Sequence, residues 1–500
     1  MLTRRDFLKV TVAGGALASF GNVAEAGNKI KEVTKTPAWC TEQERDIPVI
    51  GETDIVVVGG SSGAVSAALS AAVAGSHVFL VAGMPYLGDD ICGSFMYRIN
   101  KKEEQPQTAL ARKIFLPESD PREIYRAGSE EELLYTQHKA PTPLQVKTLL
   151  ENELINNGIQ FLYSSYVTNV LKDQSGNMAG IVIANRSGRQ AIRCKGIIDA
   201  TPCAVVAEMC NARFTTFTPG TQEFEYTVVG NTVKANPAIV SAETLPFTFQ
   251  SEGKEYPVIR YIFNYELKDK SYASLMSAEQ FIRDITWDAD QVDSSDLLWY
   301  TPSWHIISEK EHPDIPTSPE SLDRTHYIHN IIKYTPDGIE TIPSVRSLPK
   351  DVFCCKGIPN LWVTGPCAAL PRKVAAWIAR PVQSMILGEI IGEHASDSVA
   401  HIALSRETSV FYPSNTGSYC GEVKEILHPL RPHPDYGSVH SPAGTLPVLG
   451  KYDVIVMGGG TSGAPAGISA ARQQARTLVL EYLHGLGAVS YTHLTLPTIA

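Results

Sequence analysis

The chain has 500 residues and a formal net charge of −10, and its length suffices for one large domain and part of another. No basic tract follows the first ten residues, so we expect neither nucleic acid nor an anionic membrane surface as a partner. The nine cysteines include no C-x-x-C pair and none of the spacings that hold zinc or an iron–sulfur cluster. We therefore predict no metal site.

The first 26 residues have the order of an export signal. Thr3-Arg-Arg-Asp-Phe-Leu-Lys9 precedes the apolar stretch Val10–Phe20, and Ala24-Glu-Ala26 forms a small-x-small cleavage site. The apolar stretch is too short for a stable membrane span. We predict a twin-arginine signal peptide over residues 1–26 and a periplasmic or secreted protein. The expected partner is the twin-arginine export machinery, which carries folded proteins and so suits a protein that receives its cofactor in the cytoplasm.

Two apolar runs, Ile55–Val58 and Val78–Val81, follow a polar leader that we assign to residues 27–50. Such runs are typical of buried parallel strands. Between them lies Gly59-Gly60-Ser61-Ser62-Gly63-Ala64, a glycine turn that opens a helix of small residues. This order predicts an α/β, Rossmann-like layer, with Gly59, Gly60 and Gly63 as candidate cofactor-binding residues.

The same pattern returns 399 positions later, after the strand Asp453–Met457. In a G-x-G-x-x-G turn the first glycine permits the bend, the second lets the backbone approach a pyrophosphate, and the third lets the helix pack closely on the strand. The helix N-terminus binds the pyrophosphate, and an acid after the next strand binds the ribose hydroxyls. Gly458, Gly460, Gly463 and Glu481 occupy these four positions, which predicts a dinucleotide site.

The first copy departs from this pattern at three positions. Ser61 replaces the second glycine, Ala64 the third, and Ala82 the acid. A serine at the second position puts a side chain toward the phosphates, and alanine offers the ribose no acceptor. Two interpretations stay open: an altered turn that still binds a dinucleotide, and a Rossmann layer kept as a scaffold after its ligand was lost.

Between the two copies, apolar periodicity predicts a helix over Pro143–Asn156 and strands over 159–171 and 178–193. Residues 101–141 are rich in charge and proline, and we expect surface loops and a short helix there. The segment 205–345 interrupts the dinucleotide fold as an α+β insertion that is expected to cover the substrate. Its aromatic cluster could stack on a planar substrate, although packing is the commoner role of such side chains. The cluster comprises Trp287, Trp299, Tyr300, Trp304 and His305.

Other histidines and cysteines lack a supporting pattern. We assign residues 401–450 to a linker, because the proline-rich part from His428 has no periodicity. The histidines of this linker share no helix face, so solvated side chains are expected rather than a metal site. They are His428, His433 and His440. Cys354 and Cys355 are expected to be thiols rather than a strained disulfide, and Cys92 is either a small buried residue or a redox-active thiol.

Three segments besides the first turn are similar to one enzyme family. Residues 184–201 resemble a β-meander and returning strand before an A-T-G-D motif, 357–367 a late strand beside the flavin, and 384–394 a last FAD-contacting helix. Residues 54–396 thus resemble the FAD-dependent oxidoreductases of the glutathione-reductase-like, two-dinucleotide-fold type, in their secreted bacterial branch. The resemblance implies a Rossmann-like FAD/NAD(P)-binding fold, FAD as cofactor and Gly365 as a further cofactor-binding residue.

The chain also departs from this family. Pro202-Cys203 stands where relatives have glycine and an acid, and Pro366 where they commonly have arginine, so the first module, assigned to residues 51–400, has degenerate cofactor contacts. Residues 451–487, with Leu486-Gly487, resemble the family's opening segment and indicate the start of a second, truncated FAD-binding module. We assign residues 488–500 to a non-native tail, since their sequence is typical of translated adapter read-through.

Two functions follow from these observations. The chain is expected to be an exported FAD-dependent oxidoreductase that acts on a small organic substrate by hydride transfer through the flavin. Alternatively, the first module is a non-catalytic flavoprotein-like scaffold or binding module that precedes a truncated catalytic FAD module. No side chain is assigned as catalytic, because in flavoenzymes the flavin ring performs the hydride chemistry.

Overall fold

The computed structural model describes residues 39–97, 99, 107–116, 141–216, 219–230, 232–251, 253–269, 272–298, 304–308, 327–328, 332–335, 338–341, 344–370, 372–412, 418–419, 436–448, 450–481 and 486. The chain divides into two compact units, which are described one at a time. The larger unit comprises residues 43–414 and 422–444, and the smaller unit residues 1–42, 415–421 and 445–500.

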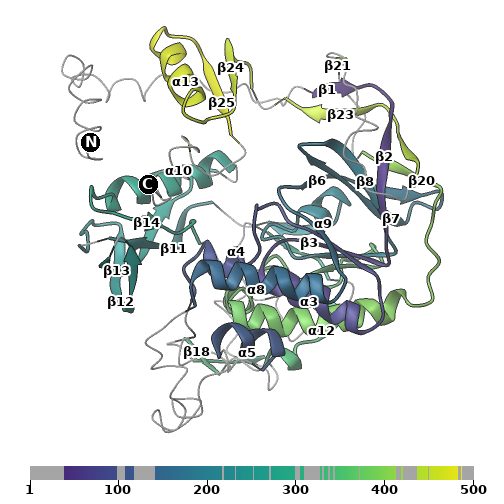
Figure 1. The fold of residues 1–500 in the computed structure, drawn as a ribbon, viewed down its shortest axis with the longest axis horizontal. Coiled ribbons are helices and arrows are strands. Elements are labelled where there is room, and N and C mark those ends of the chain that lie inside the picture. Colours follow the sequence, from purple (N-terminus) through teal and green to yellow (C-terminus); the bar gives the residue numbers. More distant parts are fainter. Residues whose placement is uncertain are drawn as a thin grey trace, which may run out of the picture. The chain divides into compact units, whose positions relative to one another are not determined.

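A five-stranded parallel sheet lies at the centre of the larger unit (Figure 1). Its strands in spatial order are β19 (Leu361–Val363), β9 (Gly196–Asp199), β3 (Ile55–Val58), β4 (Val78–Val81) and β5 (Gln160–Leu162). Every residue of the first four strands is buried, as expected for apolar runs that are covered on both faces. The predicted α/β, Rossmann-like fold is confirmed.

Helix α8 (Pro143–Asn156) has the bounds that the sequence predicts. Thr142 and Gln145 form a capping box at its start, and proline occupies the first turn, where a missing N–H costs nothing. The buried side chains recur at helical spacing, so one face of α8 packs inward. They are Val146, Leu150 and Leu154.

Two further long helices, α3 (Ser62–Val73) and α12 (Pro381–Val399), run side by side (Figure 1). Ser66 donates its hydroxyl to the Met385 carbonyl at 2.7 Å, and Ser70 donates to the Glu389 carbonyl at 2.6 Å. These bonds need a close approach of the two backbones, which small residues permit. The helix expected over 384–394 is thus confirmed as part of α12. Shorter helical segments are α4 (Asp89–Cys92), α5 (Ala109–Phe115), α11 (Arg372–Ile378) and the 3₁₀ helices Val345–Ser347 and Lys350–Phe353.

A closed barrel of six strands forms the second layer of the larger unit. In spatial order these are β2 (Arg45–Glu52), β22 (Ser438–Ser441), β20 (Thr408–Phe411), β6 (Tyr166–Asp173), β7 (Met178–Asn185) and β8 (Gly188–Arg193). The antiparallel run β6–β7–β8 is a β-meander, and the residues 184–201 that resemble such a meander and its returning strand form the end of β7, β8 and β9.

The barrel corrects two sequence assignments. Part of the leader 27–50 is strand β2, and the linker 401–450 contains β20 and β22. Arg45 of β2 pairs with Ser441 of β22, almost 400 positions away, so the pairing that makes them strands is not local in sequence. Local pattern therefore could not reveal them.

The insertion 205–345 has a sheet and a core of its own. A four-stranded antiparallel sheet has the order β12 (Ile239–Ser251), β13 (Lys254–Glu266), β11 (Thr221–Val229) and β14 (Asp293–Ser294). Helix α10 (Tyr272–Thr286) packs on it around a core that includes Phe224, Tyr261 and Phe263. The remaining elements are α9 (Val205–Met209), β10 (Phe214–Thr216), β15 (Trp304–Ile306), β16 (Tyr327–Ile328), β17 (Ile332–Thr335) and β18 (Gly338–Thr341).

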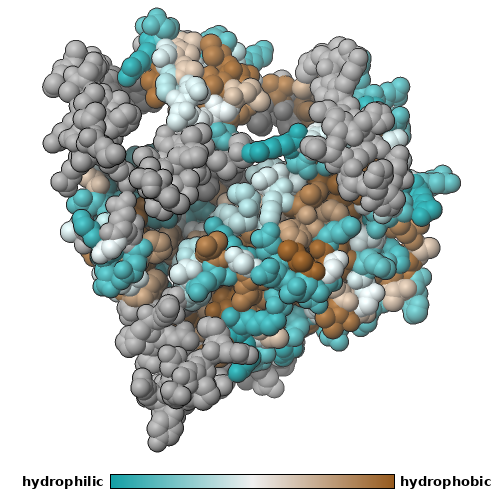
Figure 2. Space-filling view, viewed as in Figure 1, coloured by the Kyte–Doolittle hydropathy of each residue, from teal (hydrophilic) through white to brown (hydrophobic). Residues whose placement is uncertain are grey.

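The smaller unit contains a three-stranded sheet and one βαβ unit. The sheet is formed by β21 (Ser418–Tyr419), β1 (Trp39–Glu42) and β23 (Gly444–Pro447), so the assigned leader and linker supply strands here as well. The βαβ unit consists of β24 (Val454–Met457), α13 (Gly463–Arg472) and the parallel strand β25 (Thr477–Leu480). Its strands expose apolar side chains such as Ile455 and Met457, and Figure 2 shows apolar surface over this segment. Among the described residues, no helix has the length and apolar character of a membrane span.

Candidate functional site

The two glycine turns share the hydrogen bonds that frame them. Asp54 accepts the His77 N–H at 2.7 Å at the start of the first copy, and Asp453 accepts the Arg476 N–H at 2.8 Å at the start of the second. Gly59 donates its N–H to Val81 at 2.8 Å, and Gly458 donates to Leu480 at 2.7 Å. Each partner lies 399 positions from its counterpart, so the repeat found in the sequence is also a repeat of backbone geometry.

The surroundings of Gly458, Gly460 and Gly463 show why each position of the second turn suits glycine. Gly458 has φ +95°, a conformation that favours glycine. A Cβ at Gly463 would lie 1.8 Å from the Gly458 carbonyl oxygen, so the helix start requires glycine there. A Cβ at Gly460 would meet no atom of the described chain within 4 Å. The space beside Gly460 is open, as the close approach of a phosphate requires.

Glu481 lies at the end of β25 and faces this turn. The Gly459 N–H donates to Glu481 Oε2 at 2.5 Å, which holds the carboxylate beside the glycines. No acidic residue stands in the first turn of α13, and no side chain caps its N-terminus in the described structure. The second turn therefore fits a dinucleotide: a helix start open to the pyrophosphate, and a carboxylate positioned for the ribose.

In the first turn the glycines serve contacts within the chain. Gly59 has φ +134°, and a Cβ there would lie 2.8 Å from the Ala200 carbonyl oxygen. A Cβ at Gly63 would lie 2.8 Å from the Ser384 carbonyl oxygen of α12. Ser61 is the N-cap of α3, and its hydroxyl oxygen accepts the Ala64 N–H at 3.1 Å. Packing and capping thus account for these residues without a ligand.

The first turn differs from a dinucleotide site at two places: where the pyrophosphate would bind and where the ribose would bind. Asp90 accepts the Ser62 N–H at 2.7 Å and the Ser62 hydroxyl at 2.5 Å, so a carboxylate already lies on the N-terminus of α3. Ala82 is fully buried in the place of the acid, next to Gly60, and its carbonyl accepts the Ser165 N–H. The residues present at the first turn do not fit the pyrophosphate and ribose of FAD.

The loops that follow β9 and β19, which the family resemblance places beside the flavin, are next to the buried carboxyl group of Asp199. Asp199, at the end of β9, accepts the backbone N–H groups of Val206 and Ala207 and the side chain of Thr201, at 2.6–3.1 Å. Burial raises the pKa of Asp199. A Cβ at Gly365 would lie 2.4 Å from the Thr201 carbonyl oxygen, so Gly365 lets the loops after β19 and β9 meet. Its contact with flavin stays a prediction.

Among the described cysteines, Cys92 was the candidate for redox activity. Burial raises the pKa of Cys92 to about 12, and a protonated thiol is a poor nucleophile. The interpretation of Cys92 as a small buried residue is therefore favoured. Cys354 and Cys355 form no disulfide, as expected.

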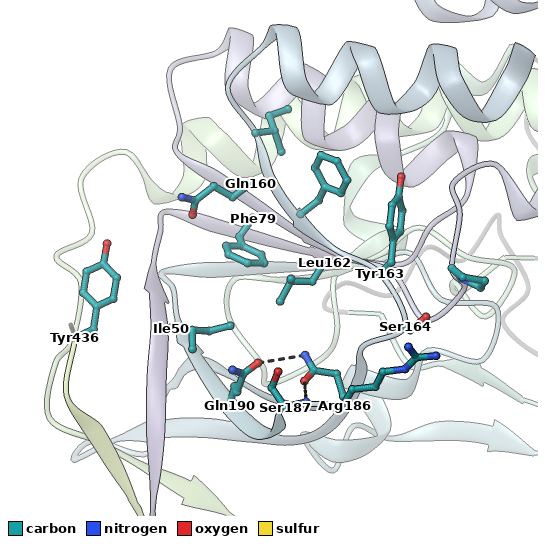
Figure 3. Close-up of a pocket in the computed structure, with 14 residues that line it drawn as sticks. Ile50, Phe79, Gln160, Leu162, Tyr163, Ser164, Arg186, Ser187, Gln190 and Tyr436 are labelled. Carbon is teal, nitrogen blue, oxygen red and sulfur yellow. Dashed lines mark hydrogen bonds between the residues drawn. The ribbon is translucent and has the colours of Figure 1, made fainter. Parts of the chain in front are cut away.

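A cavity of about 700 Å³ lies along the edge strand β5, a feature that the sequence did not predict. Figure 3 shows Ile50, Phe79 and Leu162 close together on one side of it. The β7–β8 turn supplies polar groups, where Asn185 donates to Gln190 at 3.1 Å and accepts the Ser187 N–H at 2.8 Å. The described residues that line the cavity include Tyr163 and Arg186 and contain neither a carboxylate nor a histidine.

The aromatic cluster expected over the substrate is only partly described. Trp287 is exposed just beyond the end of α10, whereas Trp304 and His305 belong to β15, which pairs with β10. Trp299 and Tyr300 lie outside the described residues, as do His428 and His433. His440 is exposed in β22, and the described residues contain no cluster that could hold a metal ion.

The family model of the FAD dependent oxidoreductases matches residues 54–342, more than half of the chain. No curated protein matches the sequence of this chain. Solved structures similar to it include CabE, an aromatic hydroxylase from angucycline biosynthesis, with 14% identity and a TM-score of 0.30 over 52% of this chain and 54% of that one. This chain therefore spans about half the length of that hydroxylase.

Two other similar structures cover more of the chain. A geranylgeranyl bacteriochlorophyll reductase-like protein from Thermoplasma acidophilum has 11% identity and a TM-score of 0.37 over 70% of this chain and 79% of that one. The flavin-dependent brominase Bmp2 has 11% identity and a TM-score of 0.36 over 70% and 80%. The family match spans β3, α3, β4, the β-meander and most of the insertion. The chain therefore belongs to the FAD-dependent oxidoreductase family, a family of enzymes whose cofactor is FAD.

Proposed function

We propose that this protein is an exported FAD-dependent oxidoreductase of the glutathione-reductase-like, secreted branch, which acts on a small organic substrate and holds its FAD at the second glycine turn. The observation that carries the proposal is the geometry of that turn: open space beside Gly460, a helix start without an acidic residue, and Glu481 beside the glycines. FAD, when bound, supplies hydride transfer.

The residues of the second turn have distinct tasks in this proposal. Gly460 leaves room for the pyrophosphate, and Gly463 keeps the N-terminus of α13 close to β24, so that its N–H groups face the phosphates. Glu481 accepts hydrogen bonds from the adenosine ribose. These contacts bind and orient the cofactor and take no part in proton transfer.

The export part of the proposal rests on the arginine pair, apolar stretch and small-x-small site within residues 1–26. N-terminal sequencing of the protein from the periplasm is expected to begin at Gly27. An uncleaved protein confined to the cytoplasm would contradict export.

A second function for the first module is favoured by a specific observation. Asp90 on the N-terminus of α3 and Ala82 at the ribose position both remove features that FAD needs. Residues 51–400 are then a non-catalytic scaffold or binding module, and activity belongs to the module that begins at residue 451.

The absorbance spectrum of protein purified natively without added cofactor tests where the flavin is held. The full-length protein is expected to carry the flavin chromophore, whereas residues 27–450 are expected to be folded by circular dichroism and colourless. A full-length protein that stays colourless after addition of FAD contradicts the use of FAD. A stoichiometric chromophore on residues 27–450 contradicts its placement at the second turn.

A further inference from the structure

The N-terminus of α3, where a dinucleotide would place its pyrophosphate, holds a carboxylate of the chain itself. Both oxygens of Asp90 are engaged there, by the backbone N–H and the hydroxyl of Ser62 at 2.7 and 2.5 Å. A helix N-terminus attracts anions through its free N–H groups and its dipole. Asp90 thus makes at the first turn the contacts that phosphate oxygens make in a dinucleotide site.

The segment that carries Asp90 is fixed by backbone contacts. Gly88 donates its N–H to the Gly60 carbonyl at 2.7 Å, which ties the segment after β4 to the glycine turn. Gly88 has φ +77°, and a Cβ there would lie 2.7 Å from Leu150 of α8. Ile91 is fully buried, and the Ser94 hydroxyl donates to the Asp90 carbonyl. Asp90 is therefore placed by the fold and is not a loose side chain near the helix.

The charges around Asp90 oppose a second anion. Burial, followed by the charges of Asp90 and Asp296, raises the pKa of the neighbouring Asp89, and burial followed by the charge of Asp296 raises the pKa of Tyr86. A cation is also present, since Lys147 Nζ lies 3.8 Å from the centroid of the Tyr86 ring. A pyrophosphate would add negative charge beside the half-buried carboxylates of Asp90 and Asp296, where repulsion is stronger than in bulk solvent.

The second turn shows the opposite arrangement within its own unit. No acidic residue stands in the first turn of α13, and the Glu481 carboxylate accepts the Gly459 N–H. The two turns share their backbone frame, so the contrast lies in the side chains at the anion position.

We infer that the Asp90 carboxyl group occupies the anion position of the first turn, where it stabilises α3 and excludes the FAD pyrophosphate from this module. The inference deepens the proposed function and rests on it, because it explains why the flavin is assigned to one of two similar turns. It also explains how the larger unit can keep this fold without the dinucleotide. Asp90 accepts the N–H bond at the N-terminus of α3 that a phosphate would otherwise accept.

Inorganic pyrophosphate is the probe for this inference, with thermal unfolding as the readout. The full-length protein with Gly460→Ala provides the background, because this change crowds the second turn. In that background pyrophosphate is expected to leave the Tm unchanged while Asp90 is present. Asp90→Ala and Asp90→Asn are expected to lower the Tm without ligand and to gain a saturable, pyrophosphate-dependent rise of about 2 °C or more.

Asp173→Ala is the matched control, since Asp173 also accepts backbone N–H bonds, from Ser175 and Asn177, but lies at the end of barrel strand β6. It is expected to gain no response to pyrophosphate. Two results overturn the inference. One is a saturable rise in Tm with pyrophosphate in the Gly460→Ala protein that retains Asp90, and the other is the absence of such a rise in folded Asp90 variants. If Asp90→Ala does not fold, the comparison of Asp90→Asn with the Gly460→Ala background protein still tests the inference. A colourless wild-type protein, by contrast, contradicts the proposed function and leaves these results unaffected.

Discussion

At the scale of single residues, Asp89 and Asp90 are adjacent carboxylates in different surroundings. Asp90 accepts two hydrogen bonds from Ser62, whereas Asp89 Oδ1 accepts the Asp90 N–H at 3.1 Å. Loss of hydration, followed by the charge of Asp90, raises the pKa of Asp89 from its ordinary 3.8 to about 7. Between these two values Asp89 is ionised in the unfolded chain and protonated in the folded protein.

The stability of the protein is therefore expected to depend on Asp89 in a defined pH window. Because the folded pKa is raised, the contribution of Asp89 is fully present below pH 3.8 and is lost as the pH rises to about 7. Asp89→Asn, which carries no charge, is expected to raise the Tm by about 2 °C or more near pH 8, with the gain shrinking toward pH 4. Thermal unfolding across this range measures the effect. A gain that does not vary with pH contradicts it.

Residue roles were only partly predictable from the sequence. Gly460 and Gly463 have the steric surroundings that their motif predicts, because the motif itself encodes a local backbone geometry. Gly63 was assigned to the cofactor, yet its surroundings explain it by contact with Ser384, more than 300 positions away. The role of Asp90 was missed, since its bond to Ser62 spans 28 positions and no short motif signals it.

At the scale of elements, the tightest helix pair is α3 with α12. A Cβ at Gly388 would lie 2.2 Å from the Gly63 carbonyl oxygen, and a Cβ at Gly392 would lie 2.3 Å from the Ala67 carbonyl oxygen. The obstructing atoms belong to backbone and cannot turn aside as a side chain can. The two glycines therefore set how closely the helices approach, and with it the position of the first turn on α3.

Gly388→Ala is expected to destabilise the protein by about 1–3 kcal/mol, because the added methyl group forces two packed helices apart. Chemical denaturation of the purified variant measures the loss. Gly230→Ala is the control, since its Cβ would meet its nearest neighbour, Val228, at an ordinary 3.5 Å. Equal stabilities for the two variants would contradict the packing role of Gly388.

Elements defined by local signals were predicted well, and those defined by distant partners were not. The bounds of α8 follow from a capping box and helical periodicity, and β3 and β4 follow from apolar runs. Strands β2, β20 and β22 lie in segments assigned to a leader and a linker, because only pairing across the barrel makes them strands.

At the scale of the whole molecule, two copies of one backbone pattern differ in the side chains around their glycine turns. The first has a buried, well-packed sheet and a carboxylate on its helix start. The second has open space beside Gly460, Glu481 beside the turn, and strands β24 and β25 without a fully buried residue. The sequence revealed this contrast through the glycines and the acid, but the carboxylate at the first turn became visible only in three dimensions.

The most direct test compares the flavin content of two matched full-length variants, Gly460→Ala and Ser61→Ala, purified natively. The methyl group added by Gly460→Ala would contact no atom of the described chain within 4 Å. A loss of flavin from the folded variant would therefore report a clash between this methyl group and the ligand. Ser61→Ala is expected to lose the N-cap of α3, at a cost of about 0.5–2 kcal/mol, and to keep its flavin. Flavin lost from Gly460→Ala and retained by Ser61→Ala is the predicted result. The reverse pattern, or full retention by Gly460→Ala, would contradict the assignment of FAD to the second turn.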